Sequence, residues 1–196
     1  MNFLAHAHLS GKDRDILLGN FIADSVKGKQ IAIYPATVQR GIRFHRAIDH
    51  FTDTHSCVKQ SVSLIQPYFH KYAPVVVDVY YDFFLSRDWH QYSQENLADF
   101  VWYVYKNMIR RFDQLPARSK YILPWMIAQN WMGSYGEYAE LDHIFRRMAK
   151  RTRFRSNMEQ AVPILQAHLT ELQQHFDCFY PRLLQYCTQW LADNPD

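Results

Sequence analysis

The sequence lacks the features that mark membrane, secreted and nucleotide-binding proteins. No apolar run approaches the roughly 20 residues that a membrane-spanning helix needs. The N-terminal stretch MNFLAHAHLSGKDRD has neither the basic start nor the sustained apolar core of a signal peptide. There is no phosphate-binding loop, no nucleophile-elbow serine motif and no H-E-x-x-H zinc motif. We therefore expect a soluble, cytoplasmic protein whose chemistry comes from some other arrangement of residues.

Cysteine and excess charge are also scarce. The three cysteines, Cys57, Cys178 and Cys187, are odd in number and lack metal-ligand spacing, so the sequence predicts reduced thiols. A formal net charge of +3 is too small to indicate nucleic acid as a partner. By contrast, hydrophobic residues make up 48% of the chain and aromatic residues 16%, which is enough for one folded domain over residues 1–196 with a ring-rich core.

Helical periodicity dominates the chain, and only 6 glycines interrupt it. Apolar residues recur at helical spacing, and prolines and capping residues divide the pattern into segments. The sequence therefore predicts an all-α protein, a compact helical bundle. The expected helices include residues 14–28, 37–53, 74–92, 94–112 and 136–151, with a short helix from Ser56 to about Pro67, one between Pro116 and Gly133, and a long final helix after Ser156.

Polar residues repeat at four-residue spacing within three of these helices, which puts the members of each pair on one helix face. Carboxylates set among Val, Tyr and Phe are costly to bury ionised unless they are paired, hydrogen-bonded or bound to a metal. A solvated helix edge explains the same spacing about as well. The pairs are Asn20 with Asp24, His45 with Asp49, and Asp78 with Asp82.

The coincidence of these pairs favours a metal site, although each pair alone is more simply a surface feature. Helices of a bundle commonly project ligands inward from facing sides. Mixed imidazole and carboxylate ligands suit manganese, iron or zinc better than calcium. The predicted ligands are His6, His8, Asp24, His45, Asp49, Asp78 and Asp82.

Residues 146–155, RRMAKRTRFR, contain six basic residues and no acidic one. Such a segment is either a solvated helix end, favourably placed near the negative end of the helix dipole, or a docking surface for an acidic partner. The residues are Arg146, Arg147, Lys150, Arg151, Arg153 and Arg155.

Five stretches of the chain closely resemble one known family. MNFLAHAHL, GNFIADSVKG, GIRFHRAIDHFTD, APVVVDVYYDFFLSRDW and FYPRLL are similar, in register, to acyl-carrier-protein phosphodiesterases, also called acyl-carrier-protein hydrolases. The resemblance implies removal of the 4'-phosphopantetheine arm from holo acyl carrier protein. It also implies an HD-like helical fold and a divalent cation, typically Mn²⁺, with Mg²⁺ or Fe²⁺ as alternatives. The adjacent His-Asp dipeptide of the HD group is absent from this chain.

The resemblance also implies roles for particular residues. Asp24, His45, Asp49, Asp78 and Asp82 would share metal binding and activation of water, with His6 and His8 as further ligands and Asp53 as a last candidate. Arg87 or Arg46 would contact phosphate oxygens. Because acyl carrier proteins are small and acidic, residues 146–155 would bind the carrier. Two other functions stay open: a metal phosphohydrolase acting on a nucleotide or other small phosphoester, and a non-catalytic helical protein that binds an acidic partner.

Overall fold

The described chain folds into helices joined by turns and loops, as the periodicity predicts. A computed structural model describes residues 1–195, and none of these residues forms a β-strand. Across the same residues, every helix falls short of the length or the apolar character that a membrane span requires. The α-helices are α1 (Phe3–Leu9), α2 (Arg14–Ile22), α3 (Ala36–Thr54), α4 (Ser56–Phe69), α5 (Ala73–Arg87), α6 (Leu97–Arg110), α7 (Ala117–Ala128), α8 (Tyr138–Ala149), α9 (Ala161–Ala167) and α10 (Leu169–Asp193).

Prolines start helices where the sequence predicts but do not end them. Pro35 and Pro116 directly precede α3 and α7, and Pro74 lies in the first turn of α5, where a missing N–H does no harm. Pro67 lies inside α4 instead of ending it. Other expected boundaries also shift: α2 passes into a short 3-10 helix, η1 (Ala23–Ser25), instead of running to residue 28.

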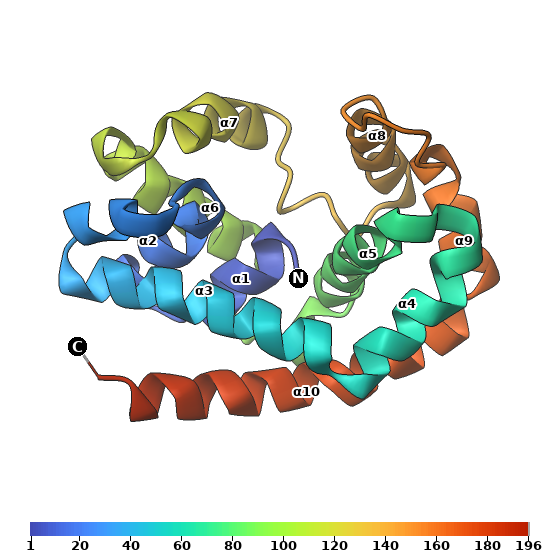
Figure 1. Cartoon of the computed structure of the whole chain (residues 1–196), viewed down its shortest axis with the longest axis horizontal. Helices are drawn as coiled ribbons and strands as arrows, with labels where there is room; N and C mark the ends of the chain where they lie inside the picture. The colour runs from blue at the N-terminus through green and yellow to red at the C-terminus, as the bar shows by residue number, and fades with distance from the viewer. Residues whose placement is uncertain (196) are drawn as a thin grey trace.

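The helices form two groups around the N-terminus of the chain (Figure 1). α2, α6 and α7 lie on one side of α1, whereas α4, α5, α8 and α9 lie on the other, and α10 runs along the base beside α3. α5 is buried on most sides, as its continuous apolar run predicts. The N-terminus therefore lies in the middle of the molecule, between α1 and α5.

α2 and α3 cross in direct backbone contact through Gly19 and Gly41. A Cβ on Gly41 would lie 2.5 Å from the Ile16 carbonyl oxygen and 2.9 Å from Gly19 Cα. A Cβ on Gly19 would lie 2.1 Å from the Val38 carbonyl oxygen. Because real side chains do not approach backbone atoms so closely, only glycine fits at both positions. The crossing brings the second half of α2 against the middle of α3.

The prediction that all three cysteines are reduced is wrong for two of them. Cys57 on α4 and Cys178 on α10 form a disulfide across a sequence separation of 121 residues, and Cys187 is a free, buried thiol. α4 packs along α10, so the two cysteines meet only because of the tertiary fold. Their spacing in the sequence carries no sign of this.

We predict that Gly41→Ala lowers the free energy of unfolding by about 1–3 kcal/mol, because the added methyl group forces the α2 and α3 backbones apart. Urea unfolding followed by circular dichroism measures the change. Arg43→Ala, at an exposed position on the same helix, is the control and should stay within about 0.5 kcal/mol of wild type. Equal stability of Gly41→Ala and wild type would contradict the close crossing.

Candidate metal centre

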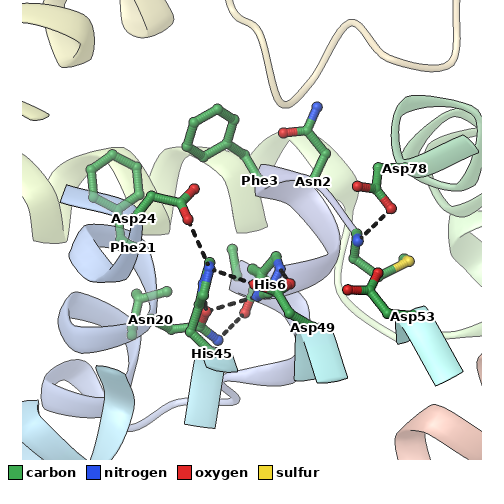
Figure 2. Close-up of a pocket in the computed structure, with 13 residues that line it drawn as sticks. Asn2, Phe3, His6, Asn20, Phe21, Asp24, His45, Asp49, Asp53 and Asp78 are labelled. Atoms are coloured by element: carbon green, nitrogen blue, oxygen red, sulfur yellow. Dashed lines mark hydrogen bonds and ion pairs between the residues drawn. The ribbon is translucent and has the colours of Figure 1, made fainter. Parts of the chain in front are cut away.

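A polar cavity of about 260 Å³ lies where α1, α2, α3 and α5 meet. Figure 2 shows imidazole and carboxylate groups from these elements turned toward one another beneath Phe3 and Asn2. Aromatic and aliphatic side chains, including Phe21 and Leu17, close part of its wall. The polar and charged side chains that line it are Asn2, His6, Asn20, Asp24, His45, Asp49, Asp53 and Asp78.

Three of these residues form a compact group of metal-ligand type. His6, His45 and Asp49 each present a ligand atom within 4.8 Å of the other two. His6 Nε2 lies 3.2 Å from Asp49 Oδ1, and His45 Nε2 lies 3.2 Å from Asp49 Oδ2. The two imidazole rings stack with their centroids 4.0 Å apart. The four-residue spacing of His45 and Asp49 on α3 thus brings them together as predicted, and His6 joins them from α1.

Asp24 lies at the edge of this group. Its Oδ1 is 3.4 Å from His45 Nε2, and its side chain is 71% exposed. η1 turns the chain after α2 and points Asp24 toward α3 (Figure 2). Burial works against ionisation of this carboxyl, but its hydrogen bond with His45 is the larger effect and lowers the pKa of Asp24. Asp24 is therefore an ionised carboxylate that faces both the group and solvent.

Asn20 holds both imidazole rings with a single amide oxygen. Asn20 Oδ1 lies 2.9 Å from Nδ1 of His6 and 2.9 Å from Nδ1 of His45. Its amide nitrogen donates to the His6 carbonyl oxygen at 2.9 Å and to Ser10 Oγ at 2.8 Å, which fixes the orientation of the amide. The oxygen can only accept, so both rings carry their proton on Nδ1 and direct Nε2 at Asp49. Sequence reasoning offers Asn20 only as a possible ligand and misses this role.

The Nε2 atom of His6 is an acceptor without a donor. It is buried and has no hydrogen-bond partner within residues 1–195, although it approaches Asp49 to 3.2 Å. With the proton on Nδ1, the lone pair of Nε2 faces a carboxylate oxygen, which is an unfavourable arrangement. A cation between the two atoms would satisfy both. Imidazole nitrogens oriented by a second hydrogen bond, together with a carboxylate, are the donor set of a divalent transition metal.

The pKa values of the two histidines shift in opposite directions. Burial, with the neighbouring His45, lowers the pKa of His6 to about 4, so His6 is neutral at pH 7. Burial also disfavours charge on His45, but hydrogen bonds with Asp24 and Asp49 outweigh it and raise its pKa to about 9. Burial opposes ionisation of Asp49 as well, yet the hydrogen bond from the protonated His45 keeps the pKa of this carboxyl well below its usual range. His6 is therefore ready to ligate, whereas His45 must first release its Nε2 proton.

Asp78 and Asp53 form the opposite edge of the cavity. Asp78 Oδ1 lies 2.8 Å from the amino group of Met1, so an ammonium group, not an imidazole, faces this carboxylate. Burial disfavours charge on that amino group, but Asp78 outweighs burial and raises its pKa. Asp53 follows Asp49 by one turn of α3, and burial together with the charge of Asp78 raises the pKa of Asp53. The cavity thus has an imidazole end and an acidic end.

Two predicted ligands lie away from the metal group. His8 is two positions from His6, which puts it about 200° around α1, and its Nδ1 lies 2.7 Å from the Tyr180 hydroxyl oxygen instead. Asp82 is fully buried and accepts the backbone N–H groups of Leu4 at 2.8 Å and of its neighbours Asn2 and Ala5 at 3.3 and 3.4 Å. Burial raises the pKa of Asp82 to about 7 against these donors. Asp82 therefore caps the start of α1 and does not pair with Asp78 on a cation.

The arginines expected to contact phosphate are engaged elsewhere. Arg87 follows Asp78 by nine residues, which is about 13 Å along α5. It pairs with Asp88, with Nη2 2.8 Å from Asp88 Oδ2, and stacks over Phe83 and Phe84. Arg46 donates to the Val26 carbonyl oxygen at 3.2 Å. Neither residue lines the cavity.

The basic segment 146–155 does not form a single face. Arg147 and Arg151 line a second cavity that shares residues with the first, whereas Arg146 and Lys150 line, together with Arg147, a further hollow. Arg146 also pairs with Asp142, with Nε 2.5 Å from Oδ2. Arg153 stacks over Phe154, and Arg155 donates to Asn157. The helical turn of α8 separates residues that are adjacent in the sequence.

Comparison with known proteins identifies one family. The family model described as acyl carrier protein phosphodiesterase matches residues 1–183. A protein of that name from Enterobacter sp. (strain 638) is 34% identical over 185 residues, which cover 94% of this chain and 96% of its own. Proteins of the same name from Yersinia pestis and Klebsiella pneumoniae subsp. pneumoniae are 30% and 32% identical and cover 94% and 99% of this chain, and 96% and 98% of their own. No solved structure matches the chain.

We predict that Asn20→Ala weakens binding of Mn²⁺, used as the probe ion, by about 10- to 100-fold. The two imidazoles lose the acceptor that orients them, although the substitution removes none of the candidate ligand residues. Isothermal titration calorimetry on metal-free protein measures the affinity. Asn107→Ala is the matched control, because Asn107 is also buried but bonds only to Tyr103 of its own helix in the described structure. An equal loss of Mn²⁺ affinity in both variants, or none in Asn20→Ala, would contradict the role of Asn20.

Proposed function

The chain belongs to the acyl carrier protein phosphodiesterase family, and from this membership we propose that it hydrolyses the phosphodiester of holo acyl carrier protein. Hydrolysis releases the 4'-phosphopantetheine arm and leaves the apo carrier. The observation that carries the proposal is the unpartnered Nε2 of His6, which faces Asp49 in a cavity with His45 and Asp24. Such a donor set suits a cation that works on a phosphate ester.

We propose that His6, His45 and Asp49 hold a divalent cation, with Asp24 at its open side. Mn²⁺ is the expected ion because the donors mix imidazole nitrogen with carboxylate oxygen, and Mg²⁺ and Fe²⁺ are the alternatives. When bound, such an ion neutralises charge on the phosphodiester and lowers the pKa of a coordinated water. The residues of the chain do the remaining work.

Two carboxylates are suited to proton transfer. Asp24 is ionised and exposed, so it can orient an attacking water and accept its proton. Asp53, at the acidic end of the cavity, has a raised pKa because of burial and of Asp78. That makes Asp53 the better proton donor to the serine oxygen that leaves with the carrier. Neither role requires His8, Asp82 or Arg87, which lie elsewhere.

The partner surface that we propose contains fewer basic residues than the segment 146–155. Arg118 on α7 and Arg151, two residues after the end of α8, are exposed and line the second cavity, beside the candidate metal centre. Acyl carrier proteins are acidic, so this arginine pair would steer the carrier toward the cavity that holds its phosphate. Arg146, which is already paired with Asp142, contributes less.

Mass spectrometry of holo acyl carrier protein incubated with the purified chain and Mn²⁺ tests the activity. We expect loss of the 4'-phosphopantetheine mass, and a fall of at least about 100-fold in kcat/KM for Asp49→Asn, since Asp49 faces both imidazoles. Asp113→Asn, at an exposed carboxylate just after α6 that lines neither cavity, is the control and should keep full activity. An intact carrier after incubation with wild type, or full activity of Asp49→Asn, would overturn the proposal.

Reversal of the arginine pair tests the docking surface. We expect the double variant Arg118→Glu/Arg151→Glu to raise KM for holo carrier about 10-fold. Hydrolysis of bis(4-nitrophenyl) phosphate, a small diester that needs no docking, should stay within about threefold. The matched control is Lys59→Glu/Lys106→Glu, which changes net charge equally at exposed positions on α4 and α6. If both substrates, or both double variants, are affected alike, the docking surface is wrong.

A further inference from the structure

A second cavity, of about 330 Å³, continues from the metal centre into the gap between α7 and α8. The two cavities share Asn2, Phe3, Asp24 and Asp78, so they meet along the N-terminal segment. The volume falls within the range of about 300–1,000 Å³ that is typical of small-molecule sites. A molecule with one end at the candidate metal centre can therefore extend into this space.

The walls of the second cavity are mostly apolar. Val75 and Val79 come from α5, Ile122 comes from α7, and Ile144 and Met148 come from α8. These helices are far apart in the sequence and enclose the space only in the fold. Arg118, Arg147 and Arg151 also line this cavity, so it suits an occupant that combines apolar groups with hydrogen-bond acceptors.

A few polar groups stand at fixed positions in this apolar lining. The guanidinium carbon of Arg147 lies 5.2 Å from the centre of the Trp131 ring, a cation–π contact that restrains the group. The hydroxyl oxygen of Tyr135 accepts a hydrogen bond from Asn2 Nδ2 at 2.9 Å. The guanidinium thus offers N–H donors at the side of an otherwise apolar space, which suits a neutral carbonyl as well as a carboxylate.

We propose that the second cavity binds the pantetheine part of the prosthetic group, an inference that rests on the proposed function. Pantetheine is an extended chain with a dimethyl-substituted carbon near the phosphate, two amide groups and a terminal thiol. With the phosphate at the metal centre, the dimethyl carbon passes between Phe3 and Val79, and an amide carbonyl reaches Arg147. The carrier serine then lies toward Asp53, on the side of the phosphate opposite the water that Asp24 orients, and the arm lies in the second cavity.

This assignment explains how binding of the pantetheine arm would determine which ester bond of the diester is cleaved. A phosphodiester has two ester bonds, and water must attack so that the serine oxygen leaves. An arm bound in the cavity fixes which of the two ester oxygens faces solvent. Binding of a group remote from the reaction thus orients the phosphorus atom for attack. A small diester without the arm has no such constraint and should depend on the metal centre alone.

Filling the cavity tests the inference. Met148→Trp and, at a more exposed position, Val75→Trp each add a ring at the cavity wall. We expect kcat/KM for holo carrier to fall at least about tenfold in these variants, with hydrolysis of bis(4-nitrophenyl) phosphate within about twofold. Ile33→Trp, on an exposed residue that lines neither cavity, is the control for an added ring. Unchanged cleavage of holo carrier in both variants, or an equal fall for both substrates, would overturn the assignment.

Binding of free pantetheine separates this inference from the proposed function. The ligand lacks phosphate and carrier, so its binding to metal-free protein reports on the second cavity alone. We expect it to protect the protein against urea, and this protection should disappear in Met148→Trp. If wild type leaves holo carrier intact but binds pantetheine, the proposed activity fails and the cavity assignment stands. If pantetheine does not bind, or binds wild type and Met148→Trp equally, the cavity assignment fails whatever the activity.

Discussion

The contact between Gly19 and Gly41 is the constraint on which the site depends. Because neither residue has a Cβ, α2 and α3 approach until their backbones touch. Asn20 follows Gly19 directly, and His45 lies one turn after Gly41, so the same approach puts the amide of α2 beside the imidazole of α3. A larger residue at either glycine would move the two helices apart and stretch the hydrogen bond between Asn20 and His45.

Asn20 uses the close approach of α2 and α3 to orient both imidazole rings. It is 1% exposed, and a buried amide is costly unless its oxygen and nitrogen are both satisfied. Here the oxygen serves two imidazoles and the nitrogen serves two acceptors, so the amide is fully engaged. The unsatisfied polar atom of the network is His6 Nε2, which faces Asp49 without a proton. The network is complete on the side of Asn20 and incomplete on the side of the cavity, where a cation would complete it.

The sequence predicts relations within a helix far better than relations between helices. Helical spacing correctly put His45 beside Asp49, because their contact follows from one turn of α3. The same rule failed for Asp82, whose partners are backbone N–H groups about 80 positions earlier in the chain. It also missed Asn20, since an amide next to a glycine carries no sign that two distant histidines will donate to it. The Cys57–Cys178 disulfide was hidden for the same reason: only the packing of α4 on α10 reveals it.

The two aspartates of α5 show how an acidic residue can shape a candidate metal site without belonging to its group of ligand type. Asp82 caps the start of α1, and α1 carries His6. Asp78 holds the amino group of Met1, and the segment from Met1 to Phe3 lines both cavities. α5 therefore fixes the position of one imidazole and the shape of the passage between the cavities. Loss of activity on substitution of either aspartate would be expected from this structural role alone. Only a property that ligation changes and capping does not, such as the affinity of the folded protein for a metal, can separate the two roles.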